Sequence, residues 1–193
     1  MIGVLALQGA FIEHIKILDK LKVKNLEVRT KNDLDKINGL IIPGGESSTN
    51  GYLLKQTGLD KEIKKRANKD LAIWGVCTGL ILLAKEVDNE FSLKLMDIKV
   101  KRNIYGSNIN SFEDKITSTK FKDFHGIFIR APRILKTSPE VEILARYLPA
   151  GKAGKKDPVM VKQGMLLGCS FHPELTTDTR IHKYFISTFD LVK

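Results

Sequence analysis

The sequence predicts an α/β protein in three layers, with helices on both faces of a mainly parallel, open β-sheet that continues into an antiparallel extension. In the first half of the chain, short continuous apolar runs alternate with segments of helical periodicity, which is typical of a parallel sheet with crossover helices. After Ala84, strand-like runs follow one another with little helix between them, which favours antiparallel pairing. We see no internal repeat, low-complexity tract or linker, so we expect one domain over residues 1–193.

The first half of the chain contains the predicted parallel strands. Ile2–Leu7 is a short apolar run of the kind buried on both faces, and Phe11–Leu21 places apolar residues at helical spacing. The other elements expected there are strands at 26–30 and 39–42, a brief helical turn at 33–38, helices at 47–54 and 60–67, and a strand from Leu71 that turns at 75–79 into an apolar helix ending at Ala84.

The second half is expected to form the extension and a closing helix. Strands are predicted at 91–102, 126–130, 141–147, 159–162 and 165–170. The closing helix should cover 178–192, with Asp178 as its cap. Residues 148–158 form a polar loop rich in Gly, Pro and Lys, to which the sequence assigns no role.

The net charge of +10 arises from 32 Lys and Arg against 22 Asp and Glu. Such an excess invites a nucleic-acid hypothesis. The lysines are spread along the chain, however, and aromatic residues do not alternate with them as a base-stacking platform requires. A solvated lysine-rich surface is the favoured interpretation, and attraction to an acidic protein partner remains open.

The two cysteines, Cys77 and Cys169, are too few and too far apart for a disulfide framework or a zinc site, so no metal is expected. The start of the chain lacks the basic leader of a signal peptide, and no apolar run approaches the length of a membrane span. We therefore expect a cytoplasmic, reduced protein.

Gly75-Val-Cys77-Thr-Gly79 lies between the buried strand and the apolar helix. A strand–turn–helix junction of this kind raises a nucleophile at the carboxyl edge of a parallel sheet, beside the amide end of a helix. The sheet edge and the helix amide end both favour the thiolate, which is the reactive form of cysteine. Taken alone, the motif fits a buried core cysteine between packing glycines equally well.

Two further turns, Gln8-Gly9 and Pro43-Gly-Gly-Glu46, also follow predicted strands. Open parallel sheets bind ligands along this edge. The glycines of the second turn could direct an N–H group at a developing negative oxygen, with the amide of Thr78 as the natural second donor. The alternative is a tight turn that only begins a helix.

His172-Pro-Glu174 follows the last predicted strand. A thiol nucleophile needs a base, and the base needs an acceptor on its other ring nitrogen. His172 and Glu174 fit these two roles. The other histidines are interpreted as structural: His14 on an early helix, His125 at the start of a strand, and His182 exposed on the closing helix. Cys169 is predicted to be a core residue.

Together these motifs resemble the class I, triad-type glutamine amidotransferases, and among them the family of glutaminase subunits of pyridoxal 5′-phosphate synthase. The matching motifs occur in order and cover nearly the whole chain. They are Leu5-Ala-Leu-Gln-Gly9 with Glu13-His14, Pro43-Gly-Gly-Glu-Ser47, Gly75-Val-Cys-Thr-Gly79, Arg102-Asn103, Ser111-Phe-Glu113, Phe128-Ile-Arg-Ala-Pro132 and Ser170-Phe-His-Pro-Glu-Leu-Thr176. The resemblance implies a flavodoxin-like sheet.

The resemblance also implies roles for individual residues. Cys77 would be the nucleophile, His172 the base and Glu174 its orienting partner, with a thioester intermediate and no cofactor. The oxyanion would lie between the amides of Gly45 and Thr78. The implied glutamine-binding residues are Gly45, Glu46, Ser47, Arg102, Ile129 and Arg130, and Arg102 could clamp the α-carboxylate with two hydrogen bonds. Gln8 and His14 would face a synthase subunit that receives the ammonia.

The chain departs from the family pattern in two places. The family has Thr-Cys-Ala around the nucleophile where this chain has Val76-Cys77-Thr78. It also has Arg-Gln in the loop after the arginine, where this chain has Ser107-Asn108, which puts contacts of that loop in doubt. Two alternatives stay open: an amidotransferase serving another pathway, and a non-catalytic, basic binding subunit.

Overall fold

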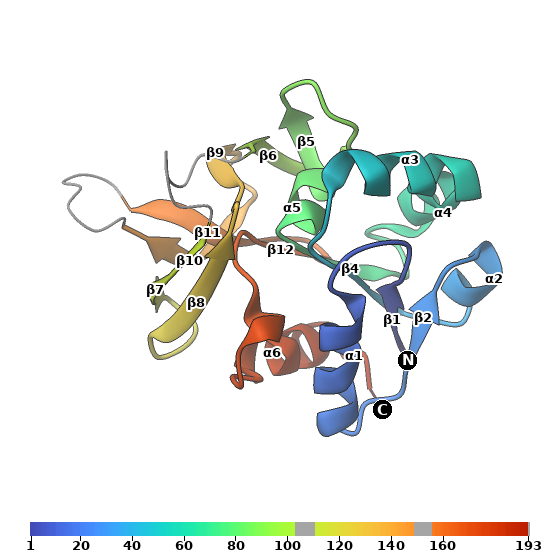
Figure 1. Cartoon of the computed structure of the whole chain (residues 1–193), viewed down its shortest axis with the longest axis horizontal. Coiled ribbons are helices and arrows are strands. Elements are labelled where there is room, and N and C mark those ends of the chain that lie inside the picture. The colour runs from blue at the N-terminus through green and yellow to red at the C-terminus, as the bar shows by residue number, and fades with distance from the viewer. Residues whose placement is uncertain (103–110, 149–155, 193) are drawn as a thin grey trace.

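The structure is a computed structural model, and it describes residues 1–102, 111–148 and 156–192. Its main sheet has nine strands in the order β2-β1-β3-β4-β12-β11-β10-β7-β8 (Figure 1). The strands from β2 to β12 pair in parallel, and those from β12 to β8 pair antiparallel. The predicted α/β class, with a parallel half and an antiparallel extension, is confirmed.

The parallel half consists of β1 (Ile2–Leu5), β2 (Asn25–Val28), β3 (Gly39–Ile42), β4 (Ala72–Val76) and β12 (Leu166–Cys169). All of β1, β3, β4 and β12 are buried along their length, as their continuous apolar runs predict. In the register, Ile42 lies beside Gly75 and Val76 beside Cys169. The turns that follow these strands therefore meet at one edge of the sheet.

Helices cover both faces of the parallel half (Figure 1). One face is covered by α1 (Phe11–Lys20) and α6 (Arg180–Thr188), whose residues Leu18 and Phe185 pack with Val4 and Trp74 of the sheet. The other face is covered by α3 (Ser47–Thr57), α4 (Leu59–Arg66) and α5 (Thr78–Leu83), and the short α2 (Lys31–Leu34) packs into the same core. Since neighbouring strand residues point to opposite faces, one strand supplies both cores.

The extension consists of β11 (Asp157–Gln163), β10 (Glu142–Tyr147), β7 (Ser111–Ser118) and β8 (Phe124–Ile129). The strand predicted at 91–102 is shorter and does not belong to it. Instead β6 (Met96–Lys101) lies between β5 (Ala84–Val87) and β9 (Arg133–Thr137) in a separate sheet. Its apolar side chains pack into the core beside α5, and this burial explains the apolar alternation that predicted a strand.

The closing helix is shorter than predicted. α6 begins at Arg180, and its N-cap residue is Thr179, which makes no side-chain capping bond. The Asp178 carboxylate nevertheless accepts the N–H of Arg180 and holds its guanidinium in an ion pair. The expectation that His182 is exposed is wrong: His182 is fully buried, because it shares the sheet-facing side of α6 with Ile181 and Phe185.

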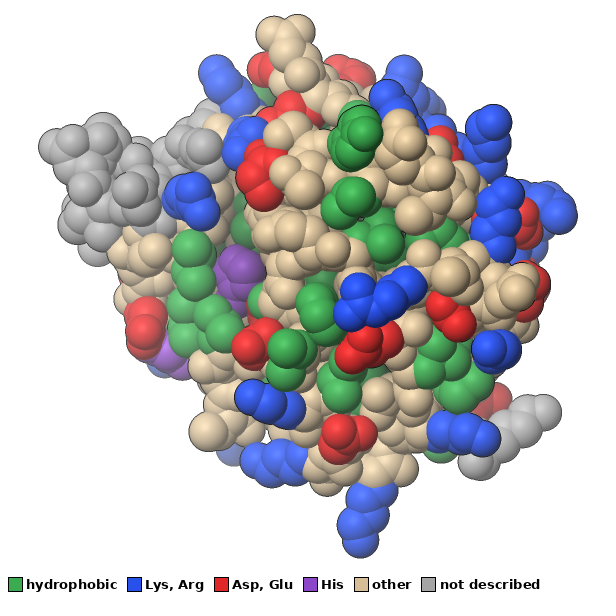
Figure 2. All heavy atoms as spheres, turned by 45° about the vertical axis from the view of Figure 1, so that its right-hand side comes forward, with side chains coloured by type: hydrophobic (Ala, Val, Ile, Leu, Met, Phe, Trp, Pro, Cys, Tyr) green, Lys and Arg blue, Asp and Glu red, His purple; other side chains and the backbone are tan. Residues whose placement is uncertain are grey.

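The surface carries mixed charge. On the face shown in Figure 2, Lys and Arg side chains are interspersed with Asp and Glu and form no single continuous patch. Several lysines pair with neighbouring carboxylates, among them Lys85 with Asp97 at 2.7 Å and Lys115 with Asp123 at 2.8 Å. This distribution favours the solvated-surface interpretation of the net charge. Within the described ranges, no helix is both long and apolar enough to cross a membrane.

Candidate active site

Cys77 lies between the last residue of β4 and the first residue of α5. Its backbone has φ +50° and ψ −102°, a conformation that side-chain-bearing residues rarely adopt. Such strained positions cluster at functional sites and are held by the structure around them. Cys77 as a residue is 7% exposed, so it lies at the sheet edge mostly covered by its neighbours.

The two glycines that flank Cys77 are explained by close backbone approach. A Cβ on Gly75 would lie 2.4 Å from the carbonyl oxygen of Gly79, and a Cβ on Gly79 would lie 2.1 Å from that of Ile42. Neither oxygen can move without shifting backbone. The pattern Gly-x-Cys-x-Gly therefore lets α5 pack tightly against β3 and β4, and this packing holds Cys77 in the strained turn.

Replacing Gly79 with alanine should consequently destabilise the fold. The added methyl group overlaps the Ile42 carbonyl, so we expect Gly79→Ala to lower the free energy of unfolding by about 3 kcal/mol, as for an overpacked core. Urea unfolding would measure it. Gly58→Ala is a matched control: its φ of +67° costs about 1 kcal/mol, but its nearest neighbour is the flexible end of Lys31. Equal losses for both variants would contradict the packing argument.

His172 and Glu174 form a buried pair beyond the end of β12. Nδ1 of His172 lies 2.6 Å from Oε1 of Glu174, and the Glu174 side chain has no exposed surface. The backbone N–H of His172 also donates to the carbonyl of Ile127 at 2.7 Å, and this bond connects the turn to β8. Because a carboxylate accepts only, Nδ1 carries the proton, and Nε2 makes no hydrogen bond to any described residue.

Cys77 and His172 approach one another beside Gly44. A Cβ on Gly44 would lie 2.5 Å from Cε1 of His172 and 3.4 Å from Cβ of Cys77, so glycine leaves the space between them open. Burial opposes charge on His172, but Cys77 and Glu174 outweigh it and raise the pKa of His172 to about 10. The geometry thus favours an imidazolium beside the sulfur. Sγ of Cys77 also lies 3.8 Å from the carbonyl oxygen of Ile129.

The backbone N–H groups of Gly45 and Thr78, near Cys77, make no backbone hydrogen bond among the described residues. The turn that carries Gly45 lies against α5, because the hydroxyl of Thr78 donates to the carbonyl oxygen of Gly45 at 2.5 Å. Gly44 is fixed in turn, since its carbonyl accepts the N–H of Ala10 at 3.0 Å. Both predicted oxyanion donors therefore belong to ordered turns at the same sheet edge.

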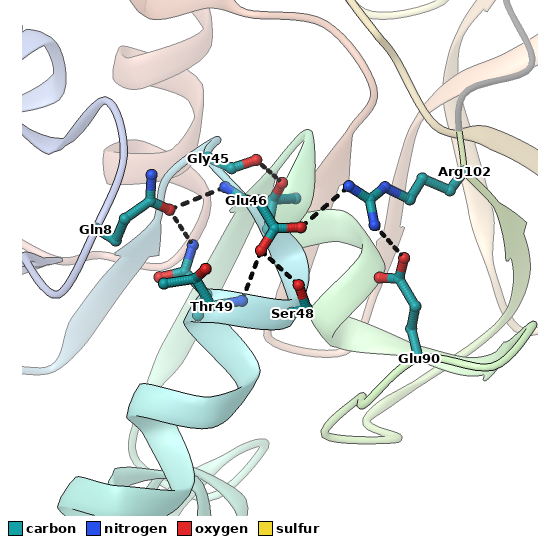
Figure 3. A network of polar contacts seen from close by, with 9 residues as sticks. Gln8, Gly45, Glu46, Ser48, Thr49, Glu90 and Arg102 are labelled. Carbon is teal, nitrogen blue, oxygen red and sulfur yellow. Dashed lines mark hydrogen bonds and ion pairs between the residues drawn. The ribbon is translucent and has the colours of Figure 1, made fainter.

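Gln8 is directed at this turn. Its Oε1 accepts the N–H of Glu46 at 2.9 Å and the side-chain amide of Asn50 at 3.2 Å (Figure 3). Gln8 is half-buried, so only part of it could face a partner. Gln8, which is expected at a partner interface, thus also links the turn after β1 to the start of α3.

Glu46 and Arg102 are joined in one polar network, shown in Figure 3. One oxygen of Glu46 accepts from the Ser48 hydroxyl at 2.6 Å and the Thr49 N–H at 2.7 Å, which caps α3 and lowers the pKa of Glu46 to about 2. The other accepts from the Arg102 guanidinium at 3.0 Å, and Arg102 also donates to Glu90 at 2.6 Å. Arg102, the predicted substrate clamp, is therefore fixed in position by the carboxylates of Glu46 and Glu90.

The remaining predicted binding residues lie at two turns. Ser47 is 2% exposed, and its hydroxyl makes no hydrogen bond among the described residues. Ile129 ends β8, and Arg130 follows with φ +42°, another strained non-glycine position. The carbonyl oxygen of Ile129 lies 3.8 Å from Sγ of Cys77, so this turn is next to the thiol.

His14 does not lie at the surface, so its expected place at a partner interface is wrong. It is fully buried on α1, with Nε2 3.6 Å from Oε2 of Glu174 and Nδ1 3.0 Å from Nε2 of His182. The helical periodicity of α1 puts residues 14, 17 and 18 on its inner side, which explains the burial. The sequence does not predict His14 or His182 at the site, because no local pattern links residues so far apart.

Some predicted features fall outside the described residues. Ser107 and Asn108 lie there, as does most of the loop at 148–158. In the part of the chain that the structure describes, no group of three or more His, Cys, Asp or Glu side chains could hold a metal ion.

Comparison with known proteins gives consistent results. Residues 4–191 match the SNO glutamine amidotransferase family. A Pseudothermotoga lettingae protein named pyridoxal 5′-phosphate synthase subunit PdxT is 49% identical over 189 residues, covering 96% of this chain and 93% of that protein. A protein of the same name from Clostridium botulinum is 45% identical over 193 residues, covering 97% of this chain and 96% of that protein.

Solved structures agree. A crystal structure described as a glutamine amidotransferase has 42% identity and a TM-score of 0.90, with 98% of each chain covered. PurLQS from Thermotoga maritima, at 15% identity and a TM-score of 0.72 with 97% of each chain covered, shares the fold alone. Because the family match spans almost the whole sequence and full-length relatives approach half identity, the chain belongs to the SNO glutamine amidotransferase family.

Proposed function

We propose that this chain hydrolyses L-glutamine to L-glutamate and ammonia, and that it delivers the ammonia to a pyridoxal 5′-phosphate synthase subunit. One observation carries the proposal. The turn that carries Cys77 and the turn that carries His172 and Glu174 are far apart in the sequence but lie side by side at one sheet edge. This arrangement supports the roles of nucleophile for Cys77, base for His172 and orienting acid for Glu174. The family membership and the names of the relatives support the choice of pathway.

The first half of the reaction forms a thioester. The Cys77 thiolate attacks the side-chain amide carbon of glutamine, and the carbonyl oxygen becomes an oxyanion. The free N–H groups of Gly45 and Thr78 receive this charge, and each such donor contributes on the order of 3 kcal/mol in comparable sites. The His172 imidazolium then gives its Nε2 proton to the departing nitrogen, so the C–N bond breaks and ammonia leaves.

The second half restores the Cys77 thiolate. His172, now neutral, removes a proton from water as the water attacks the thioester carbon. The oxyanion forms again between the same amides, and its collapse expels the Cys77 thiolate and releases glutamate. Glu174 keeps the Nδ1 proton of His172 in place throughout, so Nε2 is the nitrogen that exchanges protons. Water is the only co-reactant, and the proposal includes no metal or cofactor.

The polar network of Figure 3 is the proposed glutamine site. Arg102 binds the substrate α-carboxylate through its planar guanidinium, exchanging a contact with Glu46 for one with the ligand. Glu46 then accepts the substrate ammonium group, since its lowered pKa keeps it ionised. Ser47 and the backbone at Ile129 and Arg130 complete the site near the thiol.

A glutaminase assay with and without a pyridoxal 5′-phosphate synthase subunit tests the proposal. We expect glutamine-dependent ammonia release in the mixture, with stoichiometric glutamate, and pyridoxal 5′-phosphate synthesis that uses glutamine as its nitrogen source. A chain that hydrolyses glutamine only with an amidotransferase partner of another pathway would refute the assignment of the partner. A chain that releases no ammonia with any synthase would refute the enzymatic role.

A further inference from the structure

Two buried histidines lie behind the proposed catalytic triad. His14 on α1 and His182 on α6 have no exposed surface, and their ring nitrogens Nδ1 and Nε2 lie 3.0 Å apart. The other ring nitrogen of His14, Nε2, lies 3.6 Å from Oε2 of Glu174. Neither histidine transfers a proton in the mechanism above. Burying two imidazoles is costly unless their polar atoms find partners, so the pair requires an explanation of its own.

The directions of the protons follow from Glu174. Although burial raises the pKa of Glu174, His14 and His172 outweigh it and lower the pKa, so the side chain is a carboxylate that only accepts. Oε1 receives the His172 proton, while Oε2 is buried and accepts no hydrogen bond from a described residue. An unprotonated nitrogen of His14 facing Oε2 would set two lone pairs against each other. His14 therefore carries its proton on Nε2, pointing at Glu174.

This protonation state fixes the next contact. Burial lowers the pKa of His14, with Glu174 acting in the opposite direction, so the ring is neutral and has one N–H. Nδ1 is then an acceptor, and Nε2 of His182 must donate to it across the 3.0 Å contact. The N–H groups of His14 and His172 thus face the Glu174 carboxylate, and the N–H of His182 faces His14.

Packing holds this chain of rings in place. Trp74 of β4, itself fully buried, meets His14 edge to face at a centroid distance of 5.5 Å and His182 at 4.8 Å. Edge-to-face contacts are a preferred arrangement of aromatic rings and oppose tilting of either imidazole. Trp74 lies three residues before Cys77, so the same strand supports the nucleophile and the histidine pair.

We infer that His14 and His182 are positioning residues of the triad, which hold the Glu174 carboxylate so that Oε1 faces His172. Nε2–H of His14 on α1 faces Oε2 of Glu174 at 3.6 Å, and His182 on α6 fixes the tautomer of His14. The titratable groups around the carboxylate are His14, His172 and the buried Cys169 of β12. This inference rests on the proposed glutaminase mechanism.

Two substitutions of His14 separate positioning from packing. His14→Gln keeps an N–H donor near the position of Nε2, whereas His14→Leu removes it at similar volume. With the synthase subunit present, we expect His14→Leu to lower kcat about tenfold and leave KM within about twofold, a smaller loss than removal of the acid itself would cause. The acid limb of kcat/KM for His14→Leu should move to higher pH, because the Glu174 carboxylate loses the N–H dipole that faces Oε2 at 3.6 Å. His14→Gln should restore most of kcat and the original acid limb.

The outcomes distinguish this inference from the proposed function. An unaltered chain without glutaminase activity would refute the function itself. An active unaltered chain with equal impairment of both variants and an unshifted acid limb would refute positioning. If His14→Leu does not fold, ¹⁵N imidazole NMR of the unaltered protein decides: protons on Nε2 of both His14 and His182 support the inference, and a proton on Nδ1 of His14 overturns it.

Discussion

Replacing Cys77 with alanine is expected to lower glutamine hydrolysis in the presence of the synthase subunit by at least about 10⁴-fold, because triad enzymes lose the covalent pathway with their nucleophile. Alanine keeps the Cβ of cysteine, so the strained turn at φ +50° gains no new clash and the fold should persist. Glutamine binding should also persist, since Arg102 and Glu46 hold their places through contacts that do not involve the thiol. Ammonia release and isothermal titration with glutamine measure the two effects.

Cys169→Ala is the matched control for this prediction. Cys169 lies on the neighbouring strand β12 but is fully buried, and burial raises the pKa of its thiol, which makes it unreactive. We expect its activity to remain within about threefold of the unaltered chain. A glutamine-mimicking electrophile such as 6-diazo-5-oxo-norleucine should label Cys169→Ala and leave Cys77→Ala unlabelled. Substantial activity in Cys77→Ala would exclude the thioester mechanism.

The parallel half of the fold could be predicted because its strands are buried on both faces. The continuous apolar runs that became β1, β3 and β4 have only one compatible environment, the centre of a covered sheet. Once these strands are parallel, the turns after them must meet at one edge. The encounter of Cys77 with Gly44 and His172 is thus a consequence of strand order, and strand order can be inferred from alternation of strand and helix.

The small sheet and the edge of the extension were harder to predict. β7 is exposed at every second residue and has a single fully buried position, Ile116, so no apolar run marks it. β9 also has only one buried residue. β6 does carry alternating apolar residues, but alternation reports burial of one face and not which sheet buries it. Long-range packing beside α5 determines that β6 joins the small sheet, and a local sequence pattern carries no information about such packing.

The histidines show the same limit at the site. Helical spacing predicts that residue 14 of α1 faces inward, but an isolated histidine there is compatible with either a core or an interface. Its partner His182 is 168 residues away in sequence, and only the packing of α1 against α6 brings them together. The pair Glu174 and His172, two residues apart, could be predicted because a short spacing constrains geometry directly.

Replacing Glu174 with glutamine is expected to lower kcat/KM by about 10³- to 10⁴-fold, although the side chain keeps its size. Oε1 of Glu174 accepts the ring N–H of His172 at 2.6 Å, and Oε2 faces Nε2 of His14 at 3.6 Å, beyond hydrogen-bond distance. A glutamine amide has one oxygen and one NH₂ group, so it must present a donor to one of these two donors. If the NH₂ group faces His172, Nδ1 loses its acceptor and the imidazole is no longer held in its productive tautomer. If the NH₂ group faces His14, a neutral amide oxygen replaces the carboxylate that stabilises the imidazolium of His172.

The pH profile of Glu174→Gln should move in a defined direction. Glu174 favours the imidazolium of His172, whose pKa is raised from 6.5 to about 10, so its loss lowers that pKa and shifts the alkaline limb of kcat/KM to lower pH. By the same linkage, the stability contributed by charged His172 is full below pH 6.5 and is lost as the pH rises towards 10. Glu174→Asp is the control. The shorter side chain lengthens the contact with His172 and should lower activity. Because the negative charge is kept, the alkaline limb of kcat/KM should shift less than in Glu174→Gln. An unshifted alkaline limb in Glu174→Gln would show that another group carries the proton to ammonia.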